Sequence, residues 1–258
     1  MLRFFRNLRQ RLLTENKFSM YLLYAVGEIL LVVVGILIAL QVDSWHETRS
    51  ENREETAILK SLKTDFLQSK INVDHTLEDQ TRVVRYCARL FEVLSEGDTT
   101  VPPDSLGEFI YRGALSYWRM EPANGTYDAL IGSGRVSLIK NQTLSRLLAE
   151  YSAELKYGFE DELQSTDLTT LLVEKSSGFA PVLGKSVFAT HFLTTRRQFT
   201  DKEIREAVEA LRSDNSFLGV LAMKYALEDN RLKYQQKVSK YIADILVLLE
   251  EELREKGL

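Results

Sequence analysis

The feature that most constrains this chain is an apolar run over residues 18–42, in which Glu28 is the only formal charge. At about 1.5 Å of rise per residue, residues 21–42 form a helix of roughly 33 Å, enough to cross the hydrocarbon core of a bilayer. Tyr21 and Tyr24 at one end and Trp45 at the other suit the two membrane interfaces. We therefore predict a transmembrane helix over residues 18–44.

The charges around this run predict its orientation. The first twenty residues carry five basic side chains and one acidic one, whereas the chain as a whole has a net charge of −4. Basic residues beside a span remain in the cytoplasm. We expect the N-terminus in the cytoplasm and the acidic body outside it, in the periplasm if the cell is Gram-negative. This asymmetry is a topology signal and does not suggest nucleic-acid binding.

Two other interpretations of the run are weaker. A cleaved signal peptide needs small residues at its cleavage site, but the run ends Ala39-Leu40-Gln41-Val42. The basic leader is also long for a signal peptide. A soluble core helix would have to bury an apolar surface on nearly all sides, which is hard in a chain of 258 residues. These considerations favour an uncleaved anchor.

The position of Glu28 suggests a contact inside the membrane. A carboxylate that faces lipid costs several kcal/mol, so we expect it to be protonated, paired or turned toward a protein partner. It borders a helical face with small residues, which let another helix approach closely. This face comprises Gly27, Leu31, Gly35 and Ala39. The predicted partner is another integral membrane protein or a second copy. In the alternative, the span begins at Ile29, which leaves about 21 Å of helix and puts Glu28 near the headgroups.

The leader, residues 1–17, has the pattern of an amphipathic helix. Phe5 belongs to a series of apolar residues at helical spacing, and Arg3 and Arg6 flank it. Such a helix can lie on the cytoplasmic leaflet, held by apolar insertion and by attraction to anionic lipid. The plainer alternative is a solvated segment that only directs topology.

The predicted extracytoplasmic domain, residues 45–258, has the signals of an all-α fold. Residues 45–95 contain no glycine or proline and follow a heptad-like apolar spacing, which predicts one or two long helices continuing from the span. A second seam runs from Leu218 to Leu253, with polar residues such as Glu228 and Gln235 in its middle. We expect the helices that carry the two seams to pack antiparallel and to form an elongated helical bundle.

Shorter elements are expected between the two seams. The segment 176–195, with Gly178, Pro181 and Gly184, is predicted to be a loop with room for a short strand, and a candidate contact surface. Capping signals predict the other elements. These are helices over about 105–117, after Asn124-Gly125, from Asn141, and from the capping box at Thr200–Glu203 to about Arg212.

Two stretches resemble a known family. Residues 1–47 and 126–155 are similar to an uncharacterised family of single-pass bacterial membrane proteins with a basic leader, a Gly-Glu-containing span, an ALQ-x-(D/N)-x-W exit and a helical extracytoplasmic domain. The resemblance implies anchoring in the bacterial inner membrane and a helical fold. It supplies no catalytic residues.

The chain has few signals for chemistry. GSGR at Gly132–Arg135 lacks phosphate-loop spacing and is expected to be a helix-ending turn. Asp74, His75, Glu78 and Asp79 form adjacent pairs on a helix that could hold a divalent cation, but such a face is more often simply solvated. We predict no metal site, no cofactor and no catalytic site, since His46 and His191 have no recognisable partners either.

Cys87 is the only cysteine, so an intrachain disulfide is excluded. It lies among apolar residues at helical spacing, which favours burial over a disulfide to a second chain.

Three functions remain open. We expect a non-catalytic accessory or scaffolding subunit of a membrane complex, for example a photosynthetic, respiratory or transport complex. The alternative is an extracytoplasmic sensor or regulator, which needs a membrane partner because about twenty cytoplasmic residues cannot hold a kinase or cyclase. The third is an enzyme that acts at the outer surface of the membrane that the chain spans.

Overall fold

The computed structural model describes the backbone of residues 18–187 and 198–258, and the side chains of 26–156, 161–184 and 198–258. Its elements are helices, with no strand in the described ranges, which confirms the all-α prediction. The chain divides into two units, residues 1–56 and 57–258. The predictions for Arg3, Phe5, Arg6 and His191, and for the side chains of Tyr21 and Tyr24, lie outside the described residues.

The described part of the first unit is the beginning of a very long helix, α2 (Phe18–Glu96). Every side chain from 26 to 54 is exposed, including the apolar ones up to Val42. This helix is long and apolar enough to cross a membrane. The absence of glycine and proline from residues 45–95 predicted one or two long helices continuing from the span, and the structure has one.

In the second unit, α2 packs antiparallel to α8 (Asn215–Glu255). Lys63 Nζ lies 3.2 Å from a Glu250 carboxylate oxygen, and Gln80 Nε2 lies 2.5 Å from Glu228 Oε2. Residues farther along α2 thus contact residues nearer the beginning of α8, and only antiparallel helices pair in this way. The predicted pairing of the two seams is therefore confirmed.

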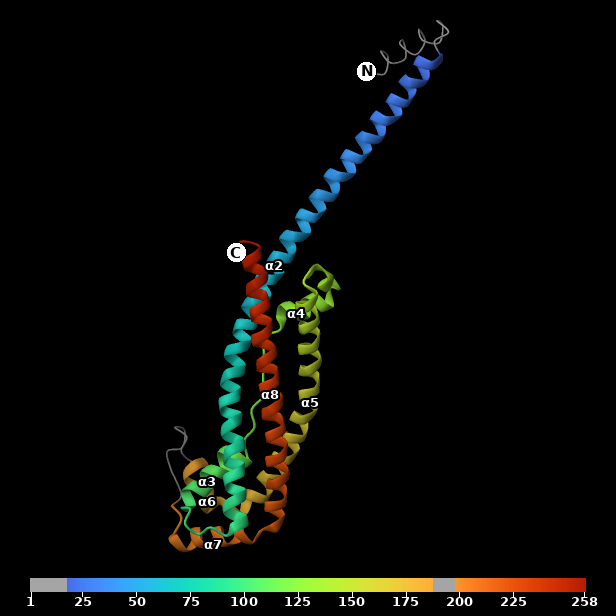
Figure 1. Ribbon diagram of the computed structural model, residues 1–258. Coiled ribbons are helices and arrows are strands. Elements are labelled where there is room, and N and C mark those ends of the chain that lie inside the picture. Colours follow the sequence, from blue (N-terminus) through green and yellow to red (C-terminus); the bar gives the residue numbers. More distant parts are fainter. Residues whose placement is uncertain (1–17, 188–197) are drawn as a thin grey trace. The chain divides into compact units, whose positions relative to one another are not determined.

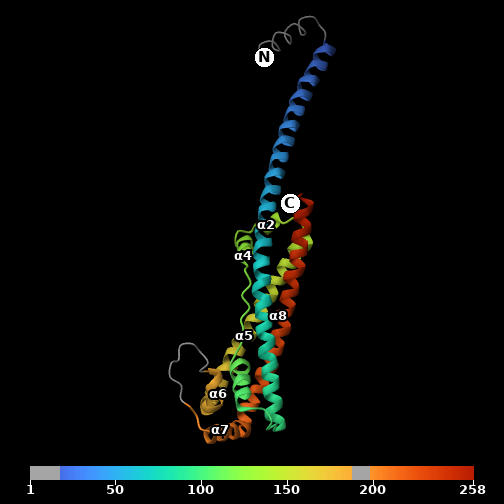
Figure 2. The same cartoon turned by 90° about the vertical axis from the view of Figure 1, so that its left-hand side faces the viewer.

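A third long helix, α5 (Gln142–Ser176), completes the bundle and also runs antiparallel to α8 (Figures 1 and 2). Lys237 Nζ lies 2.6 Å from Glu154 Oε2, and Lys175 Nζ donates to Ser216 Oγ over 2.6 Å. The helix begins as predicted, because the Asn141 side chain accepts a hydrogen bond from the backbone N–H of Leu144.

Short helices connect these three. The capping box at Thr200 is confirmed, as is the turn after α4, where Gly134 adopts φ 68°. The helix predicted over 105–117 begins at Pro103, and its final turn, which is a π-helix, ends at Ala114. The short elements are α3 (Pro103–Phe109), η1 (Ile110–Ala114), α4 (Gly125–Gly132), η2 (Arg135–Leu138), η3 (Ser177–Phe179), α6 (Ala180–Val187) and α7 (Asp201–Ser213).

The prediction of a loop over 176–195 is wrong for residues 177–187, which form η3 and α6. Pro181 is the second residue of α6, where the missing N–H costs no helical hydrogen bond. The helix is kept because one side of it is apolar, and Phe179 and Val182 are buried. Residues 188–195 lie outside the described ranges.

The core of the bundle consists of two hydrophobic clusters in succession along the long helices. The first includes Phe66 and Tyr151, whose ring centroids lie 5.2 Å apart. The second includes Phe179 and Phe217, with centroids 5.7 Å apart. Between the clusters, the buried face of each long helix carries polar residues in place of apolar ones.

One glycine lets η1 approach α2 closely. A Cβ added to Gly113 would lie 2.8 Å from the Cβ of Tyr86 and 3.0 Å from the backbone nitrogen of Cys87. A larger residue at this position would push the π-helical turn away from the second cluster, since packed interiors leave no room for it.

Candidate functional site

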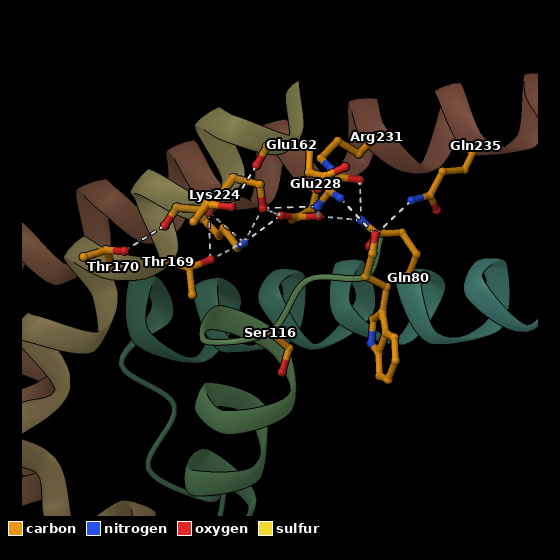
Figure 3. A network of polar contacts seen from close by, with 12 residues as sticks. Gln80, Ser116, Glu162, Thr169, Thr170, Lys224, Glu228, Arg231 and Gln235 are labelled. Atoms are coloured by element: carbon orange, nitrogen blue, oxygen red, sulfur yellow. Dashed lines mark hydrogen bonds and ion pairs between the residues drawn. The ribbon is translucent and has the colours of Figure 1, made fainter. Parts of the chain in front are cut away.

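The most distinctive site in the described residues is a group of buried polar side chains, which we call the polar layer (Figure 3). It separates the two hydrophobic clusters on each long helix. Buried polar groups are costly unless they are hydrogen-bonded, so their contacts must be accounted for one by one. The layer comprises Gln80 of α2, Ser165 and Thr169 of α5, and Lys224, Glu228, Arg231 and Gln235 of α8.

The α8 members share one helix face because they follow each other at spacings of four, three and four residues. The seam predicted from Leu218 to Leu253 included Glu228 and Gln235 but did not include Lys224 and Arg231. The missed signal is that the two charges fall at three- and four-residue offsets from Glu228, which places all three on the buried face of the helix.

Glu228 is the centre of the layer. Its Oε1 lies 2.6 Å from Lys224 Nζ and accepts a hydrogen bond from the Ser165 hydroxyl, and its Oε2 lies 2.7 Å from Arg231 Nη1. Gln80 Nε2 also donates to Oε2. Burial alone would raise the pKa of Glu228, but the two cations outweigh it and hold the pKa below its ordinary value. Glu228 is therefore a carboxylate at neutral pH.

Lys224 has its ammonium fully inside the bundle. Besides Glu228, its Nζ donates to Ser165 Oγ over 2.9 Å and to Thr169 Oγ1 over 2.7 Å. Burial lowers the pKa of Lys224, and the Glu228 carboxylate offsets this only in part. The ring of Tyr117 lies 5.6 Å from Nζ and adds a cation–π contact.

Arg231 and Gln235 attach the non-helical residues 115–124, which we call the connecting segment, to the bundle. Arg231 Nη2 and Gln235 Nε2 donate to the backbone carbonyl of Trp118, over 2.9 and 3.2 Å. Farther along, Ser69 Oγ accepts from the N–H of Ala123 over 2.8 Å and donates to its carbonyl over 3.0 Å. The layer thus fixes the register of three helices and one extended segment together.

A cavity of about 200 Å³ opens beside the polar layer; we call it the cleft. Two of its wall residues are in the layer, Arg231 and Gln235. Gln235 is buried, and its Oε1 accepts no hydrogen bond from any described residue. The other lining residues are Arg119, Met120, Pro122 and Asn124 of the connecting segment, Leu155 and Glu162 of α5, and Tyr234 of α8.

The residues predicted to contact a partner in the membrane are all in the first unit. Glu28, Leu31 and Ala39 are exposed, and apart from the adjoining residues and backbone of α2 itself no described atom lies within 4 Å of a Cβ built on Gly27 or Gly35. Their predicted contact stays a prediction.

Trp45, predicted at the outer membrane interface, is exposed, with the Arg49 guanidinium 5.5 Å from its ring centroid. A cation over an indole ring is compatible with an interfacial position, where one side of the ring is wet.

The acidic cluster at residues 74–79 forms local ion pairs. Asp74 lies 2.8 Å from Lys70 Nζ, and Asp79 lies 2.7 Å from Arg82 Nη1. Within the described part of the chain, no three His, Cys, Asp or Glu side chains gather closely enough to hold a metal ion. The arrangement is that of a solvated helix face.

Cys87 is buried in the second cluster, in agreement with the prediction. Burial raises the pKa of its thiol to about 12. We expect iodoacetamide to leave Cys87 unmodified in the folded protein and to alkylate it once the chain is unfolded, because the thiolate is the nucleophile. Mass spectrometry before and after denaturation measures this. Rapid alkylation of the folded protein would contradict it.

The raised pKa of Cys87 also makes the stability of the fold depend on pH. A pKa raised on folding contributes stability that is complete below the unfolded value of 9.0 and is lost as pH rises through about 12. We expect Cys87→Ala to remove this loss of stability at alkaline pH.

A protein-family model, described as a family of unknown function (DUF6090), matches residues 28–159. The match covers just over half of the chain. This protein belongs to the DUF6090 family. The DUF6090 match begins at Glu28 and includes the rest of the apolar run, Gln80 and the connecting segment, as well as residues 126–155, whose resemblance the sequence had indicated. Ser165 and the α8 members of the polar layer lie beyond it. No curated protein and no solved structure matches the chain.

Proposed function

We propose that this protein is a non-catalytic accessory or scaffolding subunit of a membrane complex, anchored by one span near its N-terminus. The observation that carries the proposal is the exposed apolar surface of α2 from Val26 to Val42, which needs a lipid or protein environment. A second support comes from the polar layer. The carboxylate and the two cations that would be the best candidates for chemistry bind one another within α8, and their hydrogen bonds to Gln80 and Ser165 join α8 to α2 and α5.

We propose a location in the bacterial inner membrane, as the family resemblance implies, with the orientation given by the charge pattern. The basic leader precedes the apolar helix, and acidic residues such as Asp43, Glu47 and Glu51 follow it. Under the positive-inside rule the leader stays in the cytoplasm and residues 45–258 lie in the periplasm.

The contact with the complex is proposed to lie inside the bilayer. Glu28 next to the face with Gly27, Gly35 and Ala39 offers a close helix–helix approach and a carboxylate that avoids lipid by meeting a protein partner. The partner is an integral membrane protein or a second copy of this chain.

Recovery of the tagged, full-length protein from membranes dissolved in a mild detergent tests the proposal. We expect defined membrane proteins, or a second copy, to remain bound through two purification steps and to be identified by mass spectrometry. A tagged single-span protein of unrelated sequence is the control. A chain that always elutes as a lone monomer would contradict the proposal.

One observation favours a second function, that of an extracytoplasmic sensor or regulator acting through a membrane partner. This observation is the cleft, whose buried Gln235 Oε1 is an acceptor without a described donor. The two functions differ in one respect, because only the sensor requires a small molecule in the cleft.

A further inference from the structure

One residue in the wall of the cleft, Gln235, carries a hydrogen-bond acceptor without a described donor. The Gln235 amide is held in place by its Nε2, which donates to the Trp118 carbonyl, so its Oε1 has a fixed position. The side chain is only 2% exposed, and no described residue donates to Oε1. A buried acceptor without a donor is energetically unfavourable.

The cleft also contains a pair of opposite charges. Arg119 Nε lies 3.1 Å from Glu162 Oε1, and the two side chains are 53% and 20% exposed. Exposed ion pairs contribute little to stability, so an incoming charged ligand can replace this one at low cost. The remaining guanidinium N–H groups of Arg119 suit a carboxylate, and Glu162 suits an ammonium group.

The size of the cleft limits the ligand to a small molecule. About 200 Å³ is less than the roughly 300–1,000 Å³ of pockets for drug-sized ligands. Met120, Pro122 and Leu155 form an apolar part of its wall, which suits a short hydrocarbon side chain. The lining thus combines an anion-binding group, a cation-binding group, a buried acceptor and an apolar surface.

We propose that the cleft binds a small zwitterion of the α-amino-acid class. Its ammonium group binds Glu162, its carboxylate binds Arg119, and its side chain lies against Leu155. Binding is non-covalent and opens the Arg119–Glu162 pair in exchange for two charge-assisted contacts with the ligand. The inference does not depend on the accessory-subunit function, because all the lining residues are within residues 57–258.

Isothermal titration calorimetry of the full-length protein in detergent micelles tests this, with an equimolar mixture of the twenty L-amino acids as the first probe and each amino acid singly as the second. We expect saturable binding of at least one of them. Arg119→Gln and Glu162→Gln each weaken it by at least about tenfold, which corresponds to the loss of one charge-assisted hydrogen bond. Arg112→Gln is the matched control, because Arg112 pairs with Glu108 away from the cleft, and it keeps the wild-type affinity.

The chemistry of the ligand gives a second comparison. The N-acetyl and the carboxamide derivatives of the amino acid that binds each lose one charge, and both are expected to bind at least about tenfold more weakly. Thermal unfolding of each variant shows that the fold is retained. The proposal is overturned if no amino acid gives saturable heat, which means a cleft filled by water only. It is also overturned if Arg119→Gln and Glu162→Gln leave the affinity unchanged, or if both derivatives bind as tightly as the parent.

Discussion

Replacing both Val33 and Leu37 with arginine is expected to remove the protein from the membrane fraction. Both side chains are exposed in the apolar part of α2. An arginine at the centre of a span costs about 2.5–3.5 kcal/mol on insertion scales, so two cost about 5–7 kcal/mol. Membranes washed at alkaline pH and probed with an antibody against a C-terminal tag measure the retained fraction. We expect nearly complete retention of the wild type and loss of most of the double variant.

The matched control exchanges the same two residues, Val33→Leu with Leu37→Val, and preserves the composition of the span. It is expected to be retained like the wild type. If the double arginine variant were retained as fully as the control, the apolar helix would not be the anchor, and the membrane assignment would be wrong.

The second large effect is expected at the polar layer. Glu228→Gln leaves Lys224 and Arg231 buried without a carboxylate, and breaking one partner of a buried ion pair typically costs about 3–5 kcal/mol. We expect the free energy of unfolding to fall by this amount. Urea denaturation of the full-length protein in mild detergent, followed by far-ultraviolet circular dichroism, measures it.

Asp229→Asn is the control for this substitution, because Asp229 is the next residue on α8 and pairs with Lys233 at the surface. We expect it to leave the denaturation midpoint unchanged. Adding Lys224→Met to Glu228→Gln is expected to restore part of the lost stability, since it removes one uncompensated charge. Equal midpoints for Glu228→Gln and Asp229→Asn would show that the layer does not stabilise the bundle.

The effect of pH on the layer follows from the lowered pKa of Glu228. A carboxyl group whose pKa falls on folding contributes stability that is present above its unfolded pKa and is lost as pH falls through the folded value. Acidification is therefore expected to destabilise the wild type more than Glu228→Gln.

The parts of the fold that follow from local rules were predictable. The two seam helices carry apolar residues at a recurring three- and four-residue spacing, and Asn141 and Thr200 cap helices as their side chains suggest. Residues 177–187 were not predictable in this way, because Gly178 and Pro181 are strong loop signals that buried apolar contacts of Phe179 override.

The polar layer could be predicted only in part. The charges of α8 at three- and four-residue offsets are visible in the sequence, but their partners are not. Ser165 is an ordinary serine within a helix, and the acceptor at Trp118 is a backbone carbonyl that carries no sequence signal. Such contacts depend on how α5 and the connecting segment pack, which local patterns do not determine.

The central claim is that this protein joins a membrane complex through the Glu28 face of its span. The most direct measurement compares Glu28→Leu with the wild type in the recovery of copurifying membrane proteins, at equal amounts of inserted chain. We predict that insertion is unchanged and that recovery of the partners falls at least about fivefold, a coupling of about 1 kcal/mol, as expected for one interhelical polar contact. Unchanged recovery of the same partners with Glu28→Leu would contradict the claim.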